Sequence, residues 1–171
     1  ILIDTGGTRN IYTYTGTNAL LTDASNAFVE SNAVVTKGLL DVPTDLERNA
    51  LINTVRKGQF GDVIHSEPAV VYYAAGPDSQ PDTDDDDVKI FVGANDGMLH
   101  CINDRTGDEV WSFIPPDQIG RLKQLTDAVH DYFVDGSPTV YYSGSQKILI
   151  IGSRRGGDSY IALDISNYNA P

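Results

Sequence analysis

With 171 residues, 40% of them hydrophobic, the chain is long enough to bury one sizeable core. Its net charge of −12 argues against nucleic acid or an anionic membrane surface as a partner. No stretch approaches the ~20 apolar residues of a membrane helix, so the sequence predicts no membrane span. Cys101 is the only cysteine, which excludes an internal disulfide. On a predicted strand it is expected to be a small buried apolar group.

The first residues predict two short strands and a long loop. Ile1–Asp4 is apolar and ends at the glycine pair Gly6-Gly7. Asn10–Thr15 alternates so that its tyrosines share one face, which is typical of a strand. Gly16–Asn32 is small and polar with scattered apolar residues, and is expected to be mostly loop.

A helix of about three turns is predicted after Pro43. Thr44 and Glu47 form a capping box, because the threonine hydroxyl can accept from the Glu47 amide while the glutamate side chain reaches back. Gly58 is the expected end of this helix. Its apolar face is predicted to consist of Leu46, Ala50, Leu51 and Val55.

The centre of the chain predicts three antiparallel strands. Lys89–Gly93 is β-branched and aromatic, and Asn95-Asp96-Gly97 supplies the Asp-Gly pair of a two-residue hairpin turn in which both central residues have positive φ. Met98–Asn103 returns, Thr106-Gly107 turns again, and Glu109–Ile114 carries the only tryptophan, Trp111. One such small sheet cannot bury both of its faces alone, so a second layer is expected.

The same pattern occurs twice. His65–Tyr72 resembles Asp135–Tyr142, and Lys89–Gly93 resembles Lys147–Gly152, with the acidic run Pro81–Val88 inserted in the first copy. Short antiparallel strands that repeat with Gly-Asp turns and a tryptophan are typical of β-propeller blades. Two hairpins of an ordinary sandwich are the alternative. Because a propeller needs at least four blades, the chain is expected to be part of a longer polypeptide or to be capped by another element.

The predicted fold is mainly β, a partial or modified β-propeller of four-stranded antiparallel blades with one or two short helices. The second helix is expected at Asp117–Val129, with Ile119, Leu122 and Leu125 on one side, packed across the propeller end between the two blades. The predicted division has three parts: an opening strand, loop and capping helix at 1–60, a first full blade with the acidic insertion at 61–116, and a connecting helix with a second blade at 117–171.

One cluster suggests a metal site. Asp82, Asp84 and Asp86 alternate along a loop, and carboxylates at such spacing can converge on Ca²⁺. The run lacks the sharp-turn glycine and the distal glutamate of an EF-hand-like loop, so a solvated acidic loop is the alternative. Calcium is the only cofactor that the residues suggest, and no catalytic constellation emerges. The three histidines have no partner at metal-ligand spacing, and His65 is expected to be a hydrogen-bonded structural residue.

An ordered series of segments, spread over nearly the whole chain, carries a family resemblance. The segments are Arg9–Thr13, Glu47–Arg56, Gly61–Pro68, Val92–His100, Thr106-Gly107, Trp111–Pro116, Tyr132–Pro138, Gly156-Gly157 and Tyr160–Asp164. In this order they resemble the beginning of the C-terminal domain of PilY/PilC-type proteins of type IV pilus biogenesis.

The resemblance implies a modified propeller, related in its blade motif to quinoprotein-like propellers, of which this chain would be the first part. It also implies a non-enzymatic role in pilus assembly, in opposing retraction and in adhesion, at the cell surface or pilus tip after export through the periplasm and outer membrane. The implied partners are pilin or minor pilin subunits, the rest of the propeller or a partner chain, and a surface ligand. Loops such as Gly76–Val88 and Asp117–Asp131 would present contact surface.

Some features of the family are not carried over. The family's calcium loop is an Asp-x-Asp-x-Asp-Gly-type segment in a later blade that this sequence does not reach. The von Willebrand-type domain expected upstream is absent from it, and Arg155-Gly156-Gly157-Asp158 is not an integrin-type Arg-Gly-Asp. Two alternatives stay open, a fragment of a quinone-cofactor propeller dehydrogenase and a scaffold propeller for outer-membrane protein assembly.

Overall fold

The computed structural model describes residues 9–80, 85–127 and 130–171. The expected strand at Ile1–Asp4 lies outside these ranges. Within them the chain forms one α-helix, eight strands and three short 3₁₀ helices. In chain order these are β1 (Ile11–Thr13), η1 (Ala24–Asn26), α1 (Asp45–Lys57), β2 (Ala69–Ala74), β3 (Asp87–Gly93), β4 (Leu99–Asn103), β5 (Glu109–Ile114), η2 (Ile119–Thr126), β6 (Thr139–Ser143), β7 (Gln146–Gly152), η3 (Arg154–Gly156) and β8 (Tyr160–Asp164).

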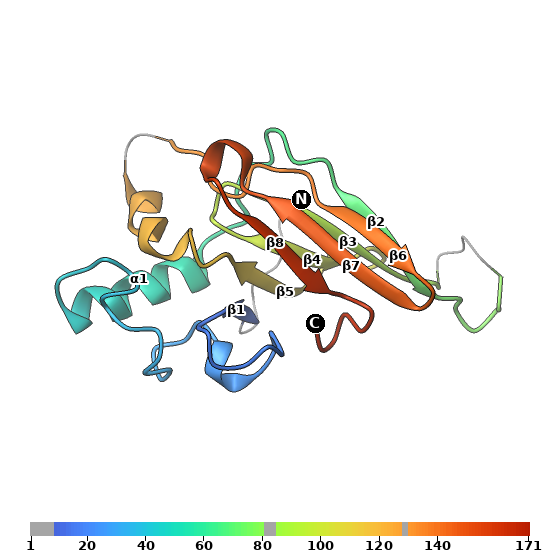
Figure 1. Ribbon diagram of the computed structural model, residues 1–171, viewed down its shortest axis with the longest axis horizontal. Coiled ribbons are helices and arrows are strands. Elements are labelled where there is room, and N and C mark those ends of the chain that lie inside the picture. The colour runs from blue at the N-terminus through green and yellow to red at the C-terminus, as the bar shows by residue number, and fades with distance from the viewer. Residues whose placement is uncertain (1–8, 81–84, 128–129) are drawn as a thin grey trace.

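The strands form two separate sheets (Figure 1). The first sheet has the order β1-β5-β4-β3-β2, and the second has the order β6-β7-β8. Neighbours along β2–β5 and along β6–β8 are antiparallel, as the hairpin pattern predicts. The mainly β class is therefore confirmed, and neither sheet is closed into a barrel. The prediction of four-stranded blades is wrong in number, because the first sheet has five strands and the second has three.

The extra strand of the first sheet is β1, which pairs in parallel with β5. The tyrosine pattern predicts this strand but gives no indication of its partner. Ile11 and Thr13 are buried, and the Thr13 hydroxyl donates to the Ile114 carbonyl over 2.9 Å. The N-terminal segment is thus part of the first sheet and does not merely precede it.

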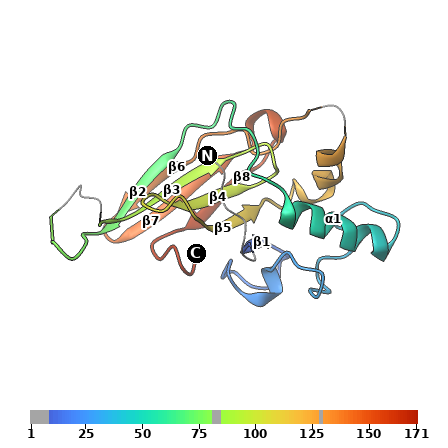
Figure 2. The same cartoon turned by 180° about the vertical axis from the view of Figure 1, so that it is seen from behind.

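The two sheets pack face to face, as the opposite views of Figures 1 and 2 show. A single apolar cluster joins them, with Phe91 and Trp111 from the first sheet and Leu149 and Ile151 from the second. The Trp111 ring lies 5.9 Å from that of Phe91, and its Nε1 donates to the Tyr168 carbonyl over 2.7 Å. The predicted second layer is therefore the second copy of the repeat.

Helix α1 begins as predicted. Thr44 accepts from the Glu47 amide while the Glu47 carboxylate accepts from the Thr44 amide, so both halves of the capping box are present. The predicted apolar face is only half right. Leu51 and Val55 are buried, but Leu46 is 81% exposed, and the buried face also contains Ile52 and Arg48. Leu46, in the first turn of α1, therefore does not contribute to the buried face.

The second predicted helix is the 3₁₀ helix η2, and it contacts the ends of both sheets: Leu122 lies close to Gly97 of the β3–β4 turn, and Arg121 donates to the Gly156 carbonyl after β7. Ile119 and Leu122 are buried in a second apolar cluster together with Ile52 and Val55 of α1. η2 therefore packs beside α1 at one end of the molecule (Figure 1). Gly120 interrupts the α-helical pattern, and the segment forms the tighter helix instead.

The turn between β3 and β4 also differs from the prediction. Gly97 has φ of +90°, but Asp96 does not have positive φ. The Ala94 amide donates to the Met98 carbonyl over 3.0 Å, so the loop contains three residues and places only the glycine in the left-handed region. As a result the Asp96 side chain is directed into the protein, where it takes part in the site described next.

Candidate functional site

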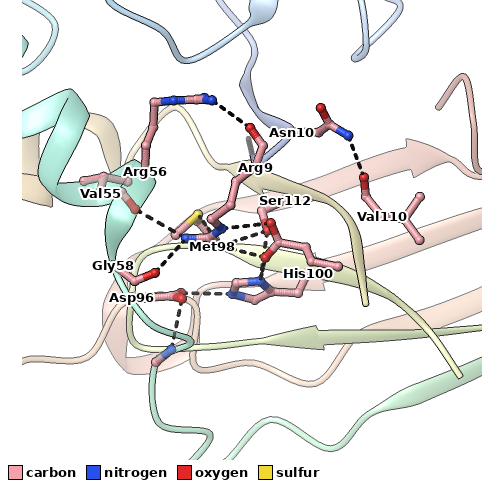
Figure 3. Close-up of polar contacts among 12 residues, drawn as sticks. Arg9, Asn10, Val55, Arg56, Gly58, Asp96, Met98, His100, Val110 and Ser112 are labelled. Atoms are coloured by element: carbon pink, nitrogen blue, oxygen red, sulfur yellow. Dashed lines mark hydrogen bonds and ion pairs between the residues drawn. The ribbon is translucent and has the colours of Figure 1, made fainter. Parts of the chain in front are cut away.

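A buried ionic network lies on the face of the first sheet that is turned away from the second sheet (Figure 3). Two nitrogens of Arg9 donate to the Glu109 carboxylate: Nε donates to Oε1 over 2.9 Å, and Nη2 donates to Oε2 over 2.6 Å. Both side chains are about 95% buried. A bidentate arginine–carboxylate pair of this kind combines strong charge-assisted hydrogen bonds with fixed orientation.

His100 is the centre of the network and is fully buried. Its Nδ1 lies 3.0 Å from Glu109 Oε2 and 2.9 Å from Ser112 Oγ, while its Nε2 lies 3.1 Å from Asp96 Oδ1. Strand pairing accounts for this arrangement, because His100 and Ser112 face each other across β4 and β5. Two positive and two negative groups thus meet in one place, with Arg9 and His100 opposite Glu109 and Asp96.

Burial alone would lower the pKa of His100, but the carboxylates of Asp96 and Glu109 outweigh it and raise the pKa to about 9. Burial alone would raise the pKa of Glu109, but hydrogen bonds from His100 and Arg9 lower it to about 2. Both groups are therefore charged at neutral pH. A paired imidazolium without access to solvent is suited to holding elements together and not to exchanging protons with a substrate.

The network ties the end of α1 to the first sheet. Arg9 Nη1 donates to the carbonyls of Val55 and Gly58, at 3.3 and 3.4 Å, and Arg56 Nη2 donates to the Arg9 carbonyl at 2.9 Å (Figure 3). The last carbonyls of the helix thus find the donors they lack within the helix. The arrangement is a structural junction between α1, β1, β4 and β5.

An open cleft of about 270 Å³ lies next to this junction. Asp96 lines it from the β3–β4 turn, and the Gly61 amide donates to Asp96 Oδ2 over 3.0 Å. A Cβ at position 61 would lie 2.4 Å from the Asp96 amide nitrogen, so only glycine fits there. Three further carboxylates border the cleft, those of Asp62, Asp127 and Asp131.

Of the proposed metal ligands, Asp82 and Asp84 lie outside the described residues. Asp86 is 93% buried at the start of the strand region, and its Oδ1 accepts from the Gly76 amide at 3.0 Å. Asp85 Oδ2 likewise accepts from the Asp78 amide, at 3.3 Å. Among residues 9–80, 85–127 and 130–171, no three His, Cys, Asp or Glu side chains converge as a metal site. The calcium site stays a prediction.

The other singled-out residues have structural positions. His65 Nδ1 lies 2.9 Å from both carboxylate oxygens of the buried Asp135, which confirms the expected hydrogen-bonded histidine. His130 Nε2 lies 3.1 Å from Asp62 Oδ2. Cys101 is buried as predicted, and burial raises the pKa of its thiol to about 12. His65, His100 and His130 are not brought together into one site.

Sequence reasoning missed the ionic network. Arg9 and Glu109 are 100 residues apart, and no motif links them. One signal was present in the hairpin pattern: His100 and Ser112 are polar residues opposite each other, each between apolar neighbours on its strand. A buried polar cross-strand pair requires further partners, which here come from the N-terminal segment.

Comparison with known proteins gives a consistent result. The chain is 34% identical over 134 residues, 65% of its length, to the type IV pilus biogenesis factor PilY1 of Pseudomonas aeruginosa strain UCBPP-PA14. It is 36% identical over 136 residues to PilY1 of strain PAO1, and 31% identical over 137 residues to a PilY1 homolog of Xylella fastidiosa strain Temecula1. The chain spans 10–12% of the length of the curated relatives it matches.

No protein-family model matches the chain, and no solved structure matches it. No helix among the described residues is long and apolar enough to cross a membrane. The relatives from two bacterial species are named as PilY1 or a PilY1 homolog, and each matches about two thirds of this chain. The chain therefore belongs to the PilY1-type family.

Proposed function

We propose that this chain is part of a type IV pilus biogenesis factor, and that it acts without catalysis in pilus assembly and surface attachment. The observation that carries the proposal is the identity of 31–36% to proteins named as type IV pilus biogenesis factors. The ionic network supports a non-enzymatic role, because its charged groups are paired with each other and close a junction between elements.

The proposed architecture is a propeller-like array in which the two sheets are successive blades. The strand registers define which residues are equivalent: Gly93 pairs with Leu99 in the first sheet, and Gly152 pairs with Tyr160 in the second. Leu99 and Tyr160 are therefore equivalent. Yet Leu99 is fully buried between the sheets, whereas Tyr160 is 84% exposed.

The same relationship holds for the rest of the face. Phe91 of the first sheet is buried against the second sheet, and its equivalent in the second sheet, Ile150, is 41% exposed. The two sheets thus stack head to tail, with different faces in contact. Head-to-tail contacts leave the outer face of the second sheet uncovered in this chain, so a further sheet can be added there. An exposed apolar sheet face supports the proposal that another blade covers it.

Contacts between equivalent positions also support blades around an axis. His65 contacts Asp135, and the Glu67 amide donates to Ser137 Oγ over 2.9 Å, and both pairs are 70 residues apart. In a propeller, equivalent residues at the strands nearest the central axis lie side by side in neighbouring blades. The residues here directly precede β2 and β6. A Cβ at Gly93, at the end of β3, would lie 2.4 Å from the Val134 carbonyl oxygen, so the end of the first sheet and the segment that leads into the second sheet approach closely.

The proposed partners and location follow from the family. They are pilin or minor pilin subunits, further blades, and a surface ligand contacted by the rim loops, at the cell surface or pilus tip. A Ca²⁺ ion bound by Asp82, Asp84 and Asp86 remains part of the proposal, with a solvated acidic loop as its alternative.

The test of the function is genetic. The gene for the full polypeptide is deleted in its own host, in a normal background and in one that cannot retract pili, and surface pili and surface attachment are measured. We expect few surface pili in the normal background and restoration by the intact gene. A role in opposing retraction returns pili in the retraction-deficient background, whereas a role in assembly does not. Normal piliation and attachment after deletion in both backgrounds would overturn the proposal.

The stacking is tested separately, by oxidative footprinting of the full-length protein. Tyr160 should be protected there, although it is 84% exposed in this chain alone. Leu46, which lies in the first turn of α1 and is 81% exposed, serves as the matched exposed control. If Tyr160 is labelled as readily as Leu46, no further sheet covers this face.

A further inference from the structure

We propose that the cleft beside Asp96 is a docking site for the side chain of a lysine from a partner protein. The cleft is built by five segments: the end of α1, the loop at 58–62, the β3–β4 turn, η2, and the segment at 130–133. It lies outside the ionic network, although it shares Asp96 with it. The inference does not depend on the pilus assignment.

Charge is the first argument. Asp62, Asp96, Asp127 and Asp131 all line the cleft, and among the described residues that line it the only basic side chain is that of His130. The negative charge of Asp96 is offset by His100. That of Asp131 is offset by Arg121, whose Nη2 lies 2.7 Å from Asp131 Oδ2.

Even if His130 is counted as a cation beside Asp62, negative charge remains in excess, because no described basic side chain forms an ion pair with Asp127. A cationic ligand is therefore complementary to the cleft.

An unsatisfied acceptor is the second argument. Gln124 lines the cleft from η2, and its Oε1 is buried without a hydrogen-bond donor among the described residues. A buried carbonyl oxygen that lacks a donor costs free energy, so rotation of the partly buried Gln124 side chain toward a ligand that brings an N–H group is favoured. A lysine ammonium carries three donors and no acceptor, which suits a cleft lined by oxygens.

The floor of the cleft is the third argument, and it distinguishes lysine from a bare ion. Val55, Met98 and Phe133 are buried beneath it, and Leu125 is partly buried. A lysine can lay its four methylenes along such a surface and keep its charge at the acidic rim. A metal ion cannot use this floor. Within the described ranges, moreover, no three acidic or histidine side chains converge closely enough to hold an ion.

The test is a titration of the ¹⁵N-labelled chain followed by amide chemical shifts. The probe is Nα-acetyl-lysine N-methylamide, and its uncharged match is Nα-acetyl-norleucine N-methylamide, which has the same stem without the ammonium. Putrescine is the third ligand. We expect saturable shifts at Asp62, Asp96 and Gln124 with the lysine probe and at least roughly threefold weaker binding of the other two.

Two variants sharpen the result. Asp127→Asn should weaken binding of the lysine probe roughly three- to fivefold, the range of a partly exposed ion pair. The matched control is Asp108→Asn, an exposed aspartate between β4 and β5 and away from the cleft, which should leave binding unchanged. Gln124→Glu should tighten binding, a gain that misfolding cannot imitate.

Each contrary outcome overturns the proposal in a distinct way. Equal binding of the norleucine probe would show an apolar groove without charge selection. Tighter binding of putrescine would point to a small polyamine. Equal weakening by Asp108→Asn would show general attraction by an acidic protein. An absence of shifts with all three ligands would show that the cleft binds no amine.

Discussion

His100 Nδ1 lies 3.0 Å from Glu109 Oε2, at a point where the histidine has no contact with solvent. The pKa of His100 is raised to about 9 in the folded chain, against about 6.5 when unfolded. The imidazolium therefore stabilises the fold fully below pH 6.5, and the contribution is lost as the pH rises through 9. The difference corresponds to roughly 3 kcal/mol as an upper bound. Urea unfolding at pH 7 and pH 9.5 should show the loss.

The control for this prediction is His100→Gln, which keeps a polar side chain but cannot titrate. Its free energy of unfolding should be lower at pH 7 and should change much less between pH 7 and pH 9.5. If the variant shows the same decline as the unaltered chain, another group is responsible for the alkaline instability.

The lowered pKa of Glu109 predicts how the stability of the fold changes in acid. Its pKa is lowered to about 2 in the folded chain from about 4.5 when unfolded. Its contribution to stability is therefore present above pH 4.5 and is lost as the pH falls through 2. The pH of half-unfolding in acid should rise in Glu109→Gln, measured by tryptophan fluorescence. An unchanged acid transition would assign acid unfolding to other carboxylates.

Removing Arg9 should be more costly than removing the whole pair. Arg9→Met leaves Glu109 buried beside fewer positive groups, and the expected loss is about 3–5 kcal/mol. Arg9→Met combined with Glu109→Leu should recover part of that loss, because the uncompensated carboxylate is gone. Chemical denaturation of both single variants and the double variant measures the coupling. Strictly additive losses would contradict an interaction between the two side chains.

Trp111 should be a stability residue of the sheet-to-sheet core. Trp111→Ala is expected to cost about 3–5 kcal/mol, since the ring is buried against Phe91. The control Tyr160→Ala removes an exposed ring and should change stability of this chain by less than about 0.5 kcal/mol. A loss well below 1 kcal/mol for Trp111→Ala would reassign the tryptophan to a contact surface.

Gly136→Ala should disturb the second sheet where the segment that leads into β6 passes the end of β7. The added Cβ would lie 1.9 Å from the Gly152 carbonyl oxygen, and the backbone cannot yield cheaply there. We expect a cost of about 1–3 kcal/mol or more in thermal unfolding. The matched control is Gly38→Ala, where the nearest atom is 3.7 Å away. Equal melting temperatures for both variants would contradict the close approach.

Local signals in the sequence predict where helices and strands form, but they do not predict how these elements pack together. Thr44 and Glu47 predict the start of α1 because a capping box uses residues within one turn. Leu46, by contrast, is apolar in the right period but exposed, since burial depends on which distant loop covers the helix. The parallel pairing of β1 with β5 has no local signature at all.

The candidate sites show the same division. The repeat of His65–Tyr72 in Asp135–Tyr142 made a second layer predictable, and equivalent residues of the two copies do touch. The acidic cleft was not predictable, because Asp62, Asp96 and Asp131 come from three separate segments. The acidic run Pro81–Val88 can be recognised from composition alone. The cleft cannot, because it forms only when segments far apart in the sequence come together.

The parallel pairing of β1 with β5 has a consequence for the order of folding. Thr13 pairs with Ile114, 101 residues later, so β1 is synthesised well before its partner strand β5 exists. Contacts of such long sequence separation form slowly. During synthesis β1 is therefore without its partner strand, and its unpaired edge is a natural target for a chaperone.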